Sequence, residues 1–419
     1  MRRTDIPQFG PLQGVKVVHS SISIAGPFCA QLMADMGADV IWIENPKAPD
    51  IARGGGFHQG WSVELSRRNM RSMALDIPSE KGREVFLKML AATDIFIEAS
   101  KGGQYDRWGL SDEELWRANP ALVIVHISGF GQAGEDSYVS RASYDPIAQA
   151  FGGLMYVNSL PGMAPFPSSQ DVGDVYSGYL GAVGALAALY RVRETGRGES
   201  VDIAQYEAVL RSQGQNMMAE LNTGNPISHT PFPNAELGGG LRGLRVLRWQ
   251  ATCVVMTLGP AVFKSVMEVL GLPYGTDEIP AGSARLYHNT PGGKMIDEAM
   301  AKFCAERPAS EVERIFSGAK VPASLVYSYT DMKDNPHFQA RETFTTYPSA
   351  RYETDVIAPN VQPVLKNEPG LVWRSGVDSG FDNEDILRDF GFDESQIEAL
   401  RADGVIGYRE DSCPQLTHR

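Results

Sequence analysis

Residues 14–45 decide the fold class of this chain and read GVKVVHSSISIAGPFCAQLMADMGADVIWIEN. Within them, Val15–His19 and Val40–Ile43 are apolar runs of strand length. The intervening segment Pro27–Met36 predicts a short helix, because proline suits a first helical turn and Gly37 suits the position after a helix end. A strand, a helix and a second strand in this order predict two parallel strands joined by a helical crossover.

The same alternation continues through the first half of the chain. A serine followed by acidic residues at 111–114 opens one helix, and Ser79 caps another that runs to about residue 90. Further strands are expected at 95–97, 122–127 and 199–203, and further helices at about 144–153, 174–193 and 204–221. The pattern predicts an α/β fold with a parallel sheet covered by helices, in which ligands bind beyond the carboxyl ends of the strands.

The second half of the chain predicts a separate unit, since 419 residues exceed what one hydrophobic core usually supports. Residues 225–245 are rich in proline and glycine, including Gly238–Gly240, and predict a mobile loop or domain connection. A strand at 252–258, helices near 261–270, 293–304 and 310–317, an irregular segment at 331–380 and short helices near 383–390 and 394–402 are expected to follow.

Composition argues against several classes of function. Hydrophobic residues make up 43% of the chain and the net charge is -13, which fits a globular protein and opposes non-specific nucleic-acid binding. The four cysteines lack metal-ligand spacing, and the N-terminus lacks the apolar core of a signal peptide. The apolar stretch Val175–Tyr190 is interrupted by glycines and is short for a membrane span, which favours a buried helix. We therefore expect a cytoplasmic protein without a nucleic-acid or membrane partner.

The loops at the expected carboxyl ends of the strands contain no standard nucleotide fingerprint. They have neither the glycine pattern of a dinucleotide site nor a Walker loop, and the chain has no nucleophile elbow of a serine hydrolase. In the loop at 98–109, Lys101 and Arg107 are two cations of the kind that hold phosphates, although spacing alone favours a solvated loop. His126 lies within an apolar strand, so a core histidine is a better interpretation than a metal ligand.

Asp174 is a carboxylate at the start of an apolar helix rich in small residues. On position alone, such an acid is best interpreted as a helix N-cap or a partner of the helix dipole. The alternative is a functional carboxylate, because Gly178, Gly181 and the alanines that follow allow a backbone or a ligand to approach closely.

Several segments, taken together in order and spacing, point to one family. They are GPLQGVKVV (10–18), IAGPF (24–28), MGADVIWIEN (36–45), DIFIEASKG (94–102), SGFGQ (128–132), IAQAFGG (147–153) and RETGRGESVDIAQYE (193–207). The chain resembles the class III CoA-transferases through these segments and over nearly its whole length.

The resemblance implies an architecture. Residues 1–224 are expected to form the N-terminal part of a Rossmann-like large domain with the CoA site, residues 225–330 a smaller α/β middle domain, and residues 331–419 a connection that returns to the large domain. Two such ring-shaped chains are expected to interlock as a homodimer. The chain departs from the family where a strand–Asp-Gly–strand hairpin is replaced by Arg245–Gln250.

The resemblance also assigns roles to residues. Asp174, rather than Asp171, takes the position of the family's catalytic aspartate, which attacks an acyl-CoA thioester to give a mixed anhydride and then an aspartyl-CoA thioester. Acyl-CoA and small carboxylates are the implied substrates, with neither a metal nor a permanently bound cofactor.

The CoA site implied by the resemblance includes Ala25, Lys101 and Arg107. Lys101 takes the position of the family's lysine that contacts a CoA phosphate. Here the chain departs from carnitine enzymes, which have an arginine immediately before the glycine of this loop. That position is Trp108 in this chain, and Arg107 lies one residue earlier.

The implied substrate divides between two subgroups. Carnitine CoA-transferases, which use carnitine, crotonobetaine and γ-butyrobetaine, are similar at 24–28 and 41–45, and bile-acid CoA-transferases are similar at 101–107, 138–145 and 201–207. Carnitine-type substrates are favoured, with bile acids as the alternative.

A trimethylammonium group would bind well in a cage of aromatic rings, for which Tyr144, Tyr176 and Trp61 are candidates, although each can equally be a packing residue. The family's α-methylacyl-CoA racemases use a His-Asp pair where this chain has Tyr144-Asp145, which argues against racemisation. A non-catalytic CoA-binding homologue is disfavoured by the presence of Asp174.

Overall fold

The computed structural model describes residues 1–48, 50–54, 61–158, 164–168, 171–226, 241–246, 251–287, 290–349 and 351–407. Contacts divide the chain into two compact units. Unit 1 consists of Met1–Leu154, Pro167–Met218 and Ala340–Arg419, and unit 2 of Met155–Phe166 and Ala219–Gln339. Residues 155–166 lie within the expected large domain but belong to unit 2 by their contacts.

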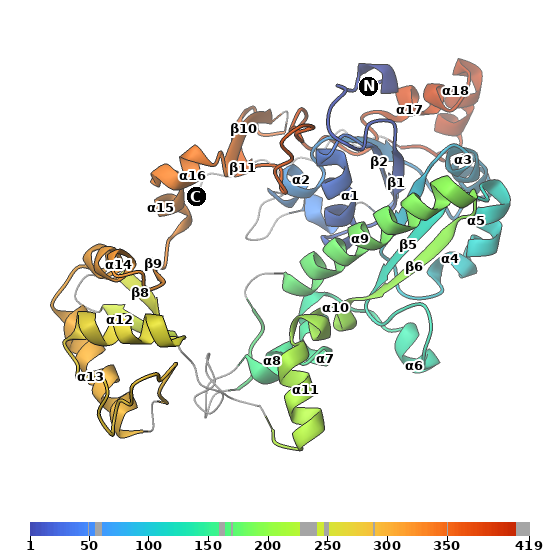
Figure 1. The fold of residues 1–419 in the computed structure, drawn as a ribbon. Coiled ribbons are helices and arrows are strands. Elements are labelled where there is room, and N and C mark those ends of the chain that lie inside the picture. Colours follow the sequence, from blue (N-terminus) through green and yellow to red (C-terminus); the bar gives the residue numbers. More distant parts are fainter. Residues whose placement is uncertain are drawn as a thin grey trace. The chain divides into compact units, whose positions relative to one another are not determined.

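Unit 1 contains a parallel α/β sheet (Figure 1). Its strands are β1 (Lys16–His19), β2 (Asp39–Glu44), β3 (Met70–Ala74), β4 (Ile95–Glu98), β5 (Val123–Ser128) and β6 (Glu199–Ala204). Its helices are α1 (Ala25–Asp35), α2 (Trp61–Ser66), α3 (Glu80–Leu90), α4 (Gln104–Arg107), α5 (Asp112–Ala118), α6 (Asp136–Val139), α7 (Asp145–Phe151), α9 (Val172–Thr195), α10 (Gln205–Ser212), α17 (Asn383–Asp389) and α18 (Glu394–Ala402). Helices α8 (Leu154–Val157), α11 (Gly214–Thr223) and α16 (Pro336–Ala340) cross the junctions between the units, and short 3-10 turns cover Arg3–Asp5 and Ile51–Arg53.

The sheet has the strand order β3-β2-β1-β4-β5-β6 and all of its strand pairs are parallel. This is the order of a doubly wound Rossmann sheet, in which the direction of winding reverses between β1 and β4. The α/β class and the parallel sheet expected from the sequence are confirmed. The expected helix 204–221 is divided, because β6 extends to Ala204 and α10 ends before Gln213.

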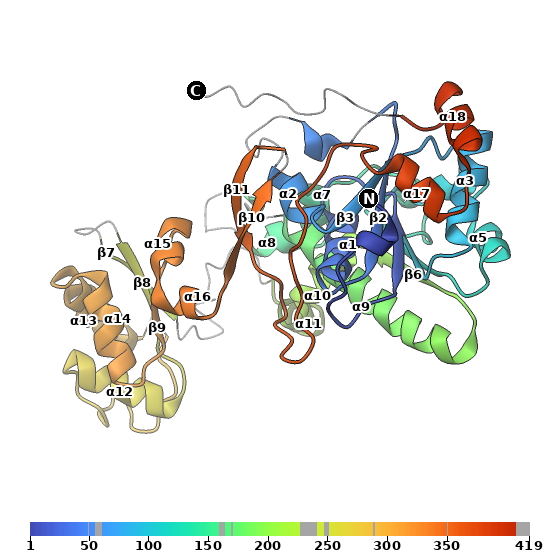
Figure 2. The same ribbon diagram turned by 90° about the horizontal axis from the view of Figure 1, so that it is seen from above.

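Alternate residues of β1, β2, β4 and β5 enter different hydrophobic cores, because successive side chains of a strand point to opposite faces. Val17 packs with residues of α1 and α9 on one face. Its neighbour Val18 packs with residues of α3, α5, α17 and α18 on the other. Figure 2 shows α17 and α18 beside α3, so segments far apart in sequence cover the same face.

Helix α9 packs tightly against this sheet because of its small residues. A Cβ atom on Gly178 would lie 2.7 Å from Cδ1 of Phe28, and one on Gly184 would lie 2.6 Å from Cγ1 of Val201. The small residues expected to admit a backbone or a ligand therefore admit α1 and β6. Helix α9 is long and apolar enough to cross a membrane by these two criteria alone, contrary to the expectation from sequence, but half of its most apolar window is buried in the protein.

Strand β3 was not predicted, because MRSMA has a positive charge at its second position and a serine at its centre. Arg71 is fully buried there, and its guanidinium pairs with Asp39 at 2.8 Å and Asp389 at 2.7 Å. The outer edge of β3 is covered by the C-terminal segment: the amide of Ser72 donates to Asp382 and that of Ala74 to Asn383, both at 2.9 Å. Charge pairing thus makes a polar sequence acceptable inside the sheet.

The expectation of an irregular segment at 331–380 was wrong in part. This segment contains α16 and the antiparallel hairpin of β10 (Phe344–Ser349) and β11 (Thr354–Pro359). Val356 and Ala358 alternate with exposed residues in β11, which is a strand pattern. Proline at position 348 obscured β10, but proline is acceptable in a two-stranded ribbon, where one edge of each strand is unpaired.

Unit 2 combines a three-stranded sheet with helices. Its elements are β7 (Leu241–Val246), β8 (Ala251–Met256), α12 (Pro260–Leu270), α13 (Pro291–Ala305), α14 (Ala309–Gly318), β9 (Ala323–Leu325) and α15 (Tyr329–Asp334). The helices expected near 261–270, 293–304 and 310–317 are confirmed. Strands β7 and β8 pair in antiparallel fashion, from Leu241 opposite Met256 to Val246 opposite Ala251. In the segment Arg245–Gln250, where the chain departs from the family, residues 247–250 lie outside the described residues. Gly238–Gly240 lie outside the described residues.

Candidate active site

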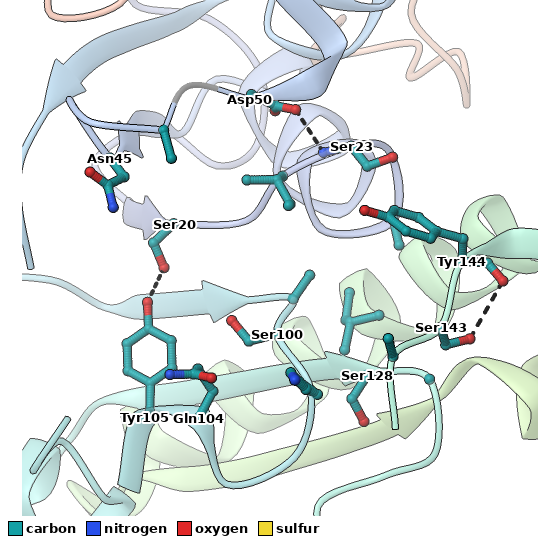
Figure 3. Close-up of a pocket in the computed structure, with 18 of the residues that line it drawn as sticks. Ser20, Ser23, Asn45, Asp50, Ser100, Gln104, Tyr105, Ser128, Ser143 and Tyr144 are labelled. Atoms are coloured by element: carbon teal, nitrogen blue, oxygen red, sulfur yellow. Dashed lines mark hydrogen bonds between the residues drawn. The ribbon is translucent and has the colours of Figure 1, made fainter. Parts of the chain in front are cut away.

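A pocket of about 390 Å³ lies at the carboxyl edge of the sheet of unit 1 (Figure 3). Residues at or just after the end of each of the six strands contribute to its lining: Ser20, Glu44, Leu75, Ala99, Ser128 and Gln205. In open α/β sheets this edge is where ligands bind.

Asp174 lies in the first turn of α9 and is 5% exposed, yet it lines this pocket. Its Oδ1 accepts a hydrogen bond from the side-chain amide of Gln205, the first residue of α10. Burial raises the pKa of Asp174 to about 7, and the negative charges of Asp145 and Asp171 add to this effect, whereas the Gln205 hydrogen bond opposes it. At neutral pH the side chain is therefore only about half ionised, and its charged form is poorly stabilised.

Asp174 lies in the first turn of α9, where an acid can interact with the helix dipole, as one interpretation of its position expects. The N-cap residue of α9 is Asp171, three positions earlier, so Asp174 is not the N-cap that its sequence position favours. Its side chain is directed to Gln205 and the pocket. A buried acid with a strongly perturbed pKa in a cleft is a candidate for chemistry.

The loop from β1 to α1 forms the side of the pocket next to Ala25, the first residue of α1. Ser23 has a left-handed backbone with φ of 62°, which is uncommon for a residue with a side chain. Its amide donates to Asp50 at 3.0 Å (Figure 3). The other oxygen of Asp50 pairs with Arg67, which is fully buried near the ring of Trp42. A buried ion pair thus holds the unusual backbone of this loop.

The loop from β4 to α4 is fixed by a chain of charged groups. Glu98 accepts hydrogen bonds from the amide of Ser100 at 2.7 Å and from Nδ1 of His126 at 2.8 Å, and Nε2 of His126 lies 2.9 Å from Asp112. Burial lowers the pKa of His126, but hydrogen bonds and charges of the two carboxylates outweigh burial and raise it to about 10. His126 is therefore a buried imidazolium with both nitrogens bonded, as expected for a core histidine, and it supports the loop that carries Lys101.

The predicted site residues do not all line the pocket. Ala25, Lys101 and Asp174 line it together. Arg107 is exposed and lies outside the lining, but its guanidinium donates to Oε1 of Gln104, a lining residue, at 3.0 Å. Trp108, which occupies the position of the missing arginine, does line the pocket.

Sequence reasoning missed two other lining residues, Gln205 and Arg141. Gln205 follows directly on a strand, and that position is the signal that would have selected it. Arg141 follows α6, and its guanidinium lies 3.7 Å from the ring centre of Tyr138.

The structure does not assemble the three candidate aromatic residues in this pocket. Tyr144 lines it, but Trp61 and Tyr176 are absent from the lining as far as the structure describes it. Trp61 instead packs on Tyr352, with ring centres 4.4 Å apart. Within the described part of the chain, no group of three or more histidine, cysteine, aspartate or glutamate residues is arranged to hold a metal ion.

The fold and the pocket define an α/β protein with a buried carboxyl group of raised pKa and with cations at the carboxyl edge of a Rossmann sheet. The chain belongs to CoA-transferase family III, whose sequence profile matches residues 12–383. The resemblance found from the segments above is confirmed.

Individual relatives agree with this assignment. Two proteins named L-carnitine CoA-transferase, from Proteus mirabilis (strain HI4320) and Proteus sp. (strain LE138), are each 39% identical over 404 residues, covering 96% of this chain and 97% of theirs. A crystal structure of a CAIB/BAIF family protein from Brucella suis has the same fold, with a TM-score of 0.75 and 24% identity, covering 91% of this chain and all of that one.

Proposed function

We propose that this protein transfers CoA from an acyl-CoA thioester to a free carboxylate, with Asp174 as the nucleophile. The observation that carries the proposal is the position of Asp174, a buried carboxylate with a pKa of about 7 that lines a pocket together with Lys101. Membership of CoA-transferase family III supports the reaction class.

The reaction follows from the chemistry of the carboxylate. An oxygen of Asp174 attacks the thioester carbonyl, the C–S bond breaks, and a mixed anhydride and CoA thiolate form. The thiolate then attacks the Asp174 carbonyl of the anhydride, which releases the first carboxylate and leaves an aspartyl-CoA thioester. The acceptor carboxylate repeats these steps in reverse and regenerates Asp174. One thioester replaces another, so the exchange is close to thermoneutral.

In this proposal Lys101 and Arg107 bind phosphates of CoA, and Ala25 contacts CoA through the start of α1. The exposed position of Lys101 at the pocket supports its role, because an ammonium group attracts phosphate oxygens. The first amides of a helix lack acceptors within that helix and are suited to anionic oxygens, which supports Ala25. Support for Arg107 is weaker, since only its contact with Gln104 connects it to the pocket.

The proposed acceptors are carnitine, crotonobetaine and γ-butyrobetaine. The support is the 39% identity, over almost the full length, to two proteins named L-carnitine CoA-transferase. Bile acids are the alternative. Racemisation is not proposed, since Tyr144 occupies the position of the racemases' histidine.

The test is CoA exchange followed by mass spectrometry. The enzyme is incubated with crotonobetainyl-CoA and, separately, L-carnitine, γ-butyrobetaine or cholate. We expect new thioesters with the first two acceptors, a covalent CoA adduct on the peptide that contains Asp174, and loss of exchange in Asp174→Ala. Asp171→Asn, which alters the neighbouring carboxyl, serves as the matched control and should retain exchange. Full activity of Asp174→Ala would overturn the proposed mechanism. Exchange with cholate alone would overturn the proposal that the acceptors are carnitine-type carboxylates.

We further propose a cytoplasmic protein that acts as an interlocked homodimer, as the family resemblance implies. The described cysteines, Cys29, Cys253 and Cys304, are all free, which is in keeping with a reducing compartment. Light scattering coupled to size-exclusion chromatography tests the dimer, and a mass of one chain would contradict it.

A further inference from the structure

Helices α7 and α9 meet at a buried carboxylate that takes no part in the proposed exchange. Asp145, the first residue of α7, is 4% exposed. Its Oδ1 accepts the backbone amides of Gly173 at 2.6 Å and Asp174 at 3.2 Å, and its Oδ2 accepts the side-chain amide of Gln149 at 2.5 Å. The contact joins two helices that the sequence separates by twenty residues.

The two amides belong to the first turn of α9, whose N–H groups have no acceptor within the helix itself. Asp145 therefore caps α9 from another helix. The approach is close, because a Cβ atom on Gly173 would lie 3.0 Å from Oδ1 of Asp145 and 3.3 Å from Cβ of Ala148. The amide of Asp174 is one of the two groups held, so this contact fixes the backbone that carries the proposed nucleophile.

We infer that Asp145 is a positioning residue, which ties the first turn of α9 so that the Asp174 carboxylate faces the pocket, and whose negative charge beside Asp174 moves the acid limit of the reaction to higher pH. This inference rests on the proposed role of Asp174. Both oxygens of Asp145 accept hydrogen bonds from the protein, and Asp145 is not among the residues that line the pocket in the described part of the chain.

The charged surroundings of Asp174 support the second half of the inference. Burial is the main reason for its raised pKa, followed by the charge of Asp145 and then that of Asp171. Other charged residues line the pocket or lie on the elements packed against α9, but they are not among the groups that raise the pKa of Asp174. In the pocket these are Glu44, Asp50, Lys101 and Arg141; on the packed elements they are Asp35 of α1, His126 of β5, Glu199 and Asp202 of β6, and Glu207 and Arg211 of α10.

Two substitutions separate the effect of the tether, meaning the hydrogen bonds from the amides of Gly173 and Asp174 to Asp145, from the effect of the Asp145 charge. Asp145→Asn keeps an oxygen for the two amides but removes the charge, so the acid limb of kcat/KM should move to lower pH by about one unit. The plateau kcat should stay within about threefold of the wild type, since the positioning contacts remain. Asp145→Ala removes the tether as well, and its plateau kcat should fall about ten- to a hundredfold.

The control is Asp171→Asn, which removes the charge with the smaller effect on the pKa of Asp174 and leaves the hydrogen bonds of Asp145 in place. Its acid limb should move in the same direction by less, with no loss of kcat. Thermal melting and the Kd for free CoA check that each variant is folded. If Asp145→Asn folds, binds CoA and leaves the acid limb unmoved, the role of the charge is wrong. If Asp145→Ala keeps the plateau kcat, the positioning role is wrong.

The proposed function fails in a distinguishable way. If the wild-type enzyme does not exchange CoA, or if Asp174→Ala retains full exchange, Asp174 is not the nucleophile. The pH profiles of the Asp145 variants then no longer report on Asp174. With exchange that depends on Asp174, those profiles test Asp145 alone.

Discussion

Replacing Asp174 by asparagine is expected to stabilise the folded chain at neutral and alkaline pH. The pKa of this carboxyl is about 7 in the folded chain, and its ordinary value, 3.8, applies to the unfolded chain. Between these values the folded state retains a proton that the unfolded state has lost. The stabilisation that protonation provides is therefore complete below about pH 4 and is lost as the pH rises through 7.

The magnitude follows from the same two values. One pH unit corresponds to about 1.4 kcal/mol, so the full difference amounts to about 4 kcal/mol. This is the free energy of folding that the chain loses when Asp174 is ionised in the folded state. At pH 5 only about 1–2 kcal/mol of it is lost, because the folded carboxyl is still mostly protonated. Asparagine has nearly the same shape, carries no charge and can accept the Gln205 hydrogen bond, so Asp174→Asn should escape the cost at every pH.

Urea unfolding followed by tryptophan fluorescence at pH 5 and pH 8 measures this difference. The stability advantage of Asp174→Asn should grow by about 2–3 kcal/mol between the two pH values. Asp355→Asn is the matched control, since it removes an exposed carboxyl from the same unit, and its effect should change little with pH. An advantage of equal size at both pH values, or a loss of stability at pH 8, would refute the reasoning.

Three further predictions concern neighbouring groups. Gln205→Leu removes a hydrogen bond that favours the carboxylate, so the pKa of Asp174 should rise above 7 and the acid limb of kcat/KM should move to higher pH by about 1–2 units, measured by rate profiles. Lys101→Gln should raise KM for acyl-CoA about tenfold with kcat nearly unchanged, and by more than Arg107→Gln does, measured by steady-state kinetics. Arg67→Met leaves Asp50 buried without its partner, so the free energy of unfolding should fall by about 3–5 kcal/mol, measured by urea unfolding.

Controls make these predictions discriminating. For Gln205→Leu, the control is Gln213→Ala, which lies on the same part of the chain but donates to backbone carbonyls of Gly152 and Val209, away from the pocket; it should leave the pH profile in place. For Lys101→Gln, an equal or larger effect of Arg107→Gln would contradict the difference in their positions. For Arg67→Met, unchanged stability would show that the pair with Asp50 contributes nothing.

The stability that the protein loses by burying the Asp174 carboxylate is consistent with the proposed role of this group as a nucleophile. A carboxylate in water is well solvated and a poor nucleophile, whereas burial beside Asp145 leaves this one with few groups to stabilise its charge. The protein would then lose stability at the group that the proposed reaction uses, which is the usual balance at catalytic sites.

The sequence predicted the regular elements that have an unambiguous hydrophobic pattern. The centres of β1 and β2 are continuous runs of apolar residues buried on both faces, so their pattern is plain. Strand β3 was missed because Arg71 acquires its partners, Asp39 and Asp389, only when distant segments fold together. Local propensity has no information on such pairs.

The candidate site shows the same division. Sequence alone predicted the α/β class, the edge of the sheet at which the pocket lies and, through the family segments, Asp174 and Lys101 as candidate site residues that line this pocket. Only the tertiary structure decided that Asp174 is no N-cap, that Gln205 bonds it, and that Asp145 holds its backbone. The physical reason is distance along the chain. Hydrophobic periodicity is a local property that a sequence displays directly, whereas the pKa and orientation of a buried carboxylate depend on groups that only folding brings within reach.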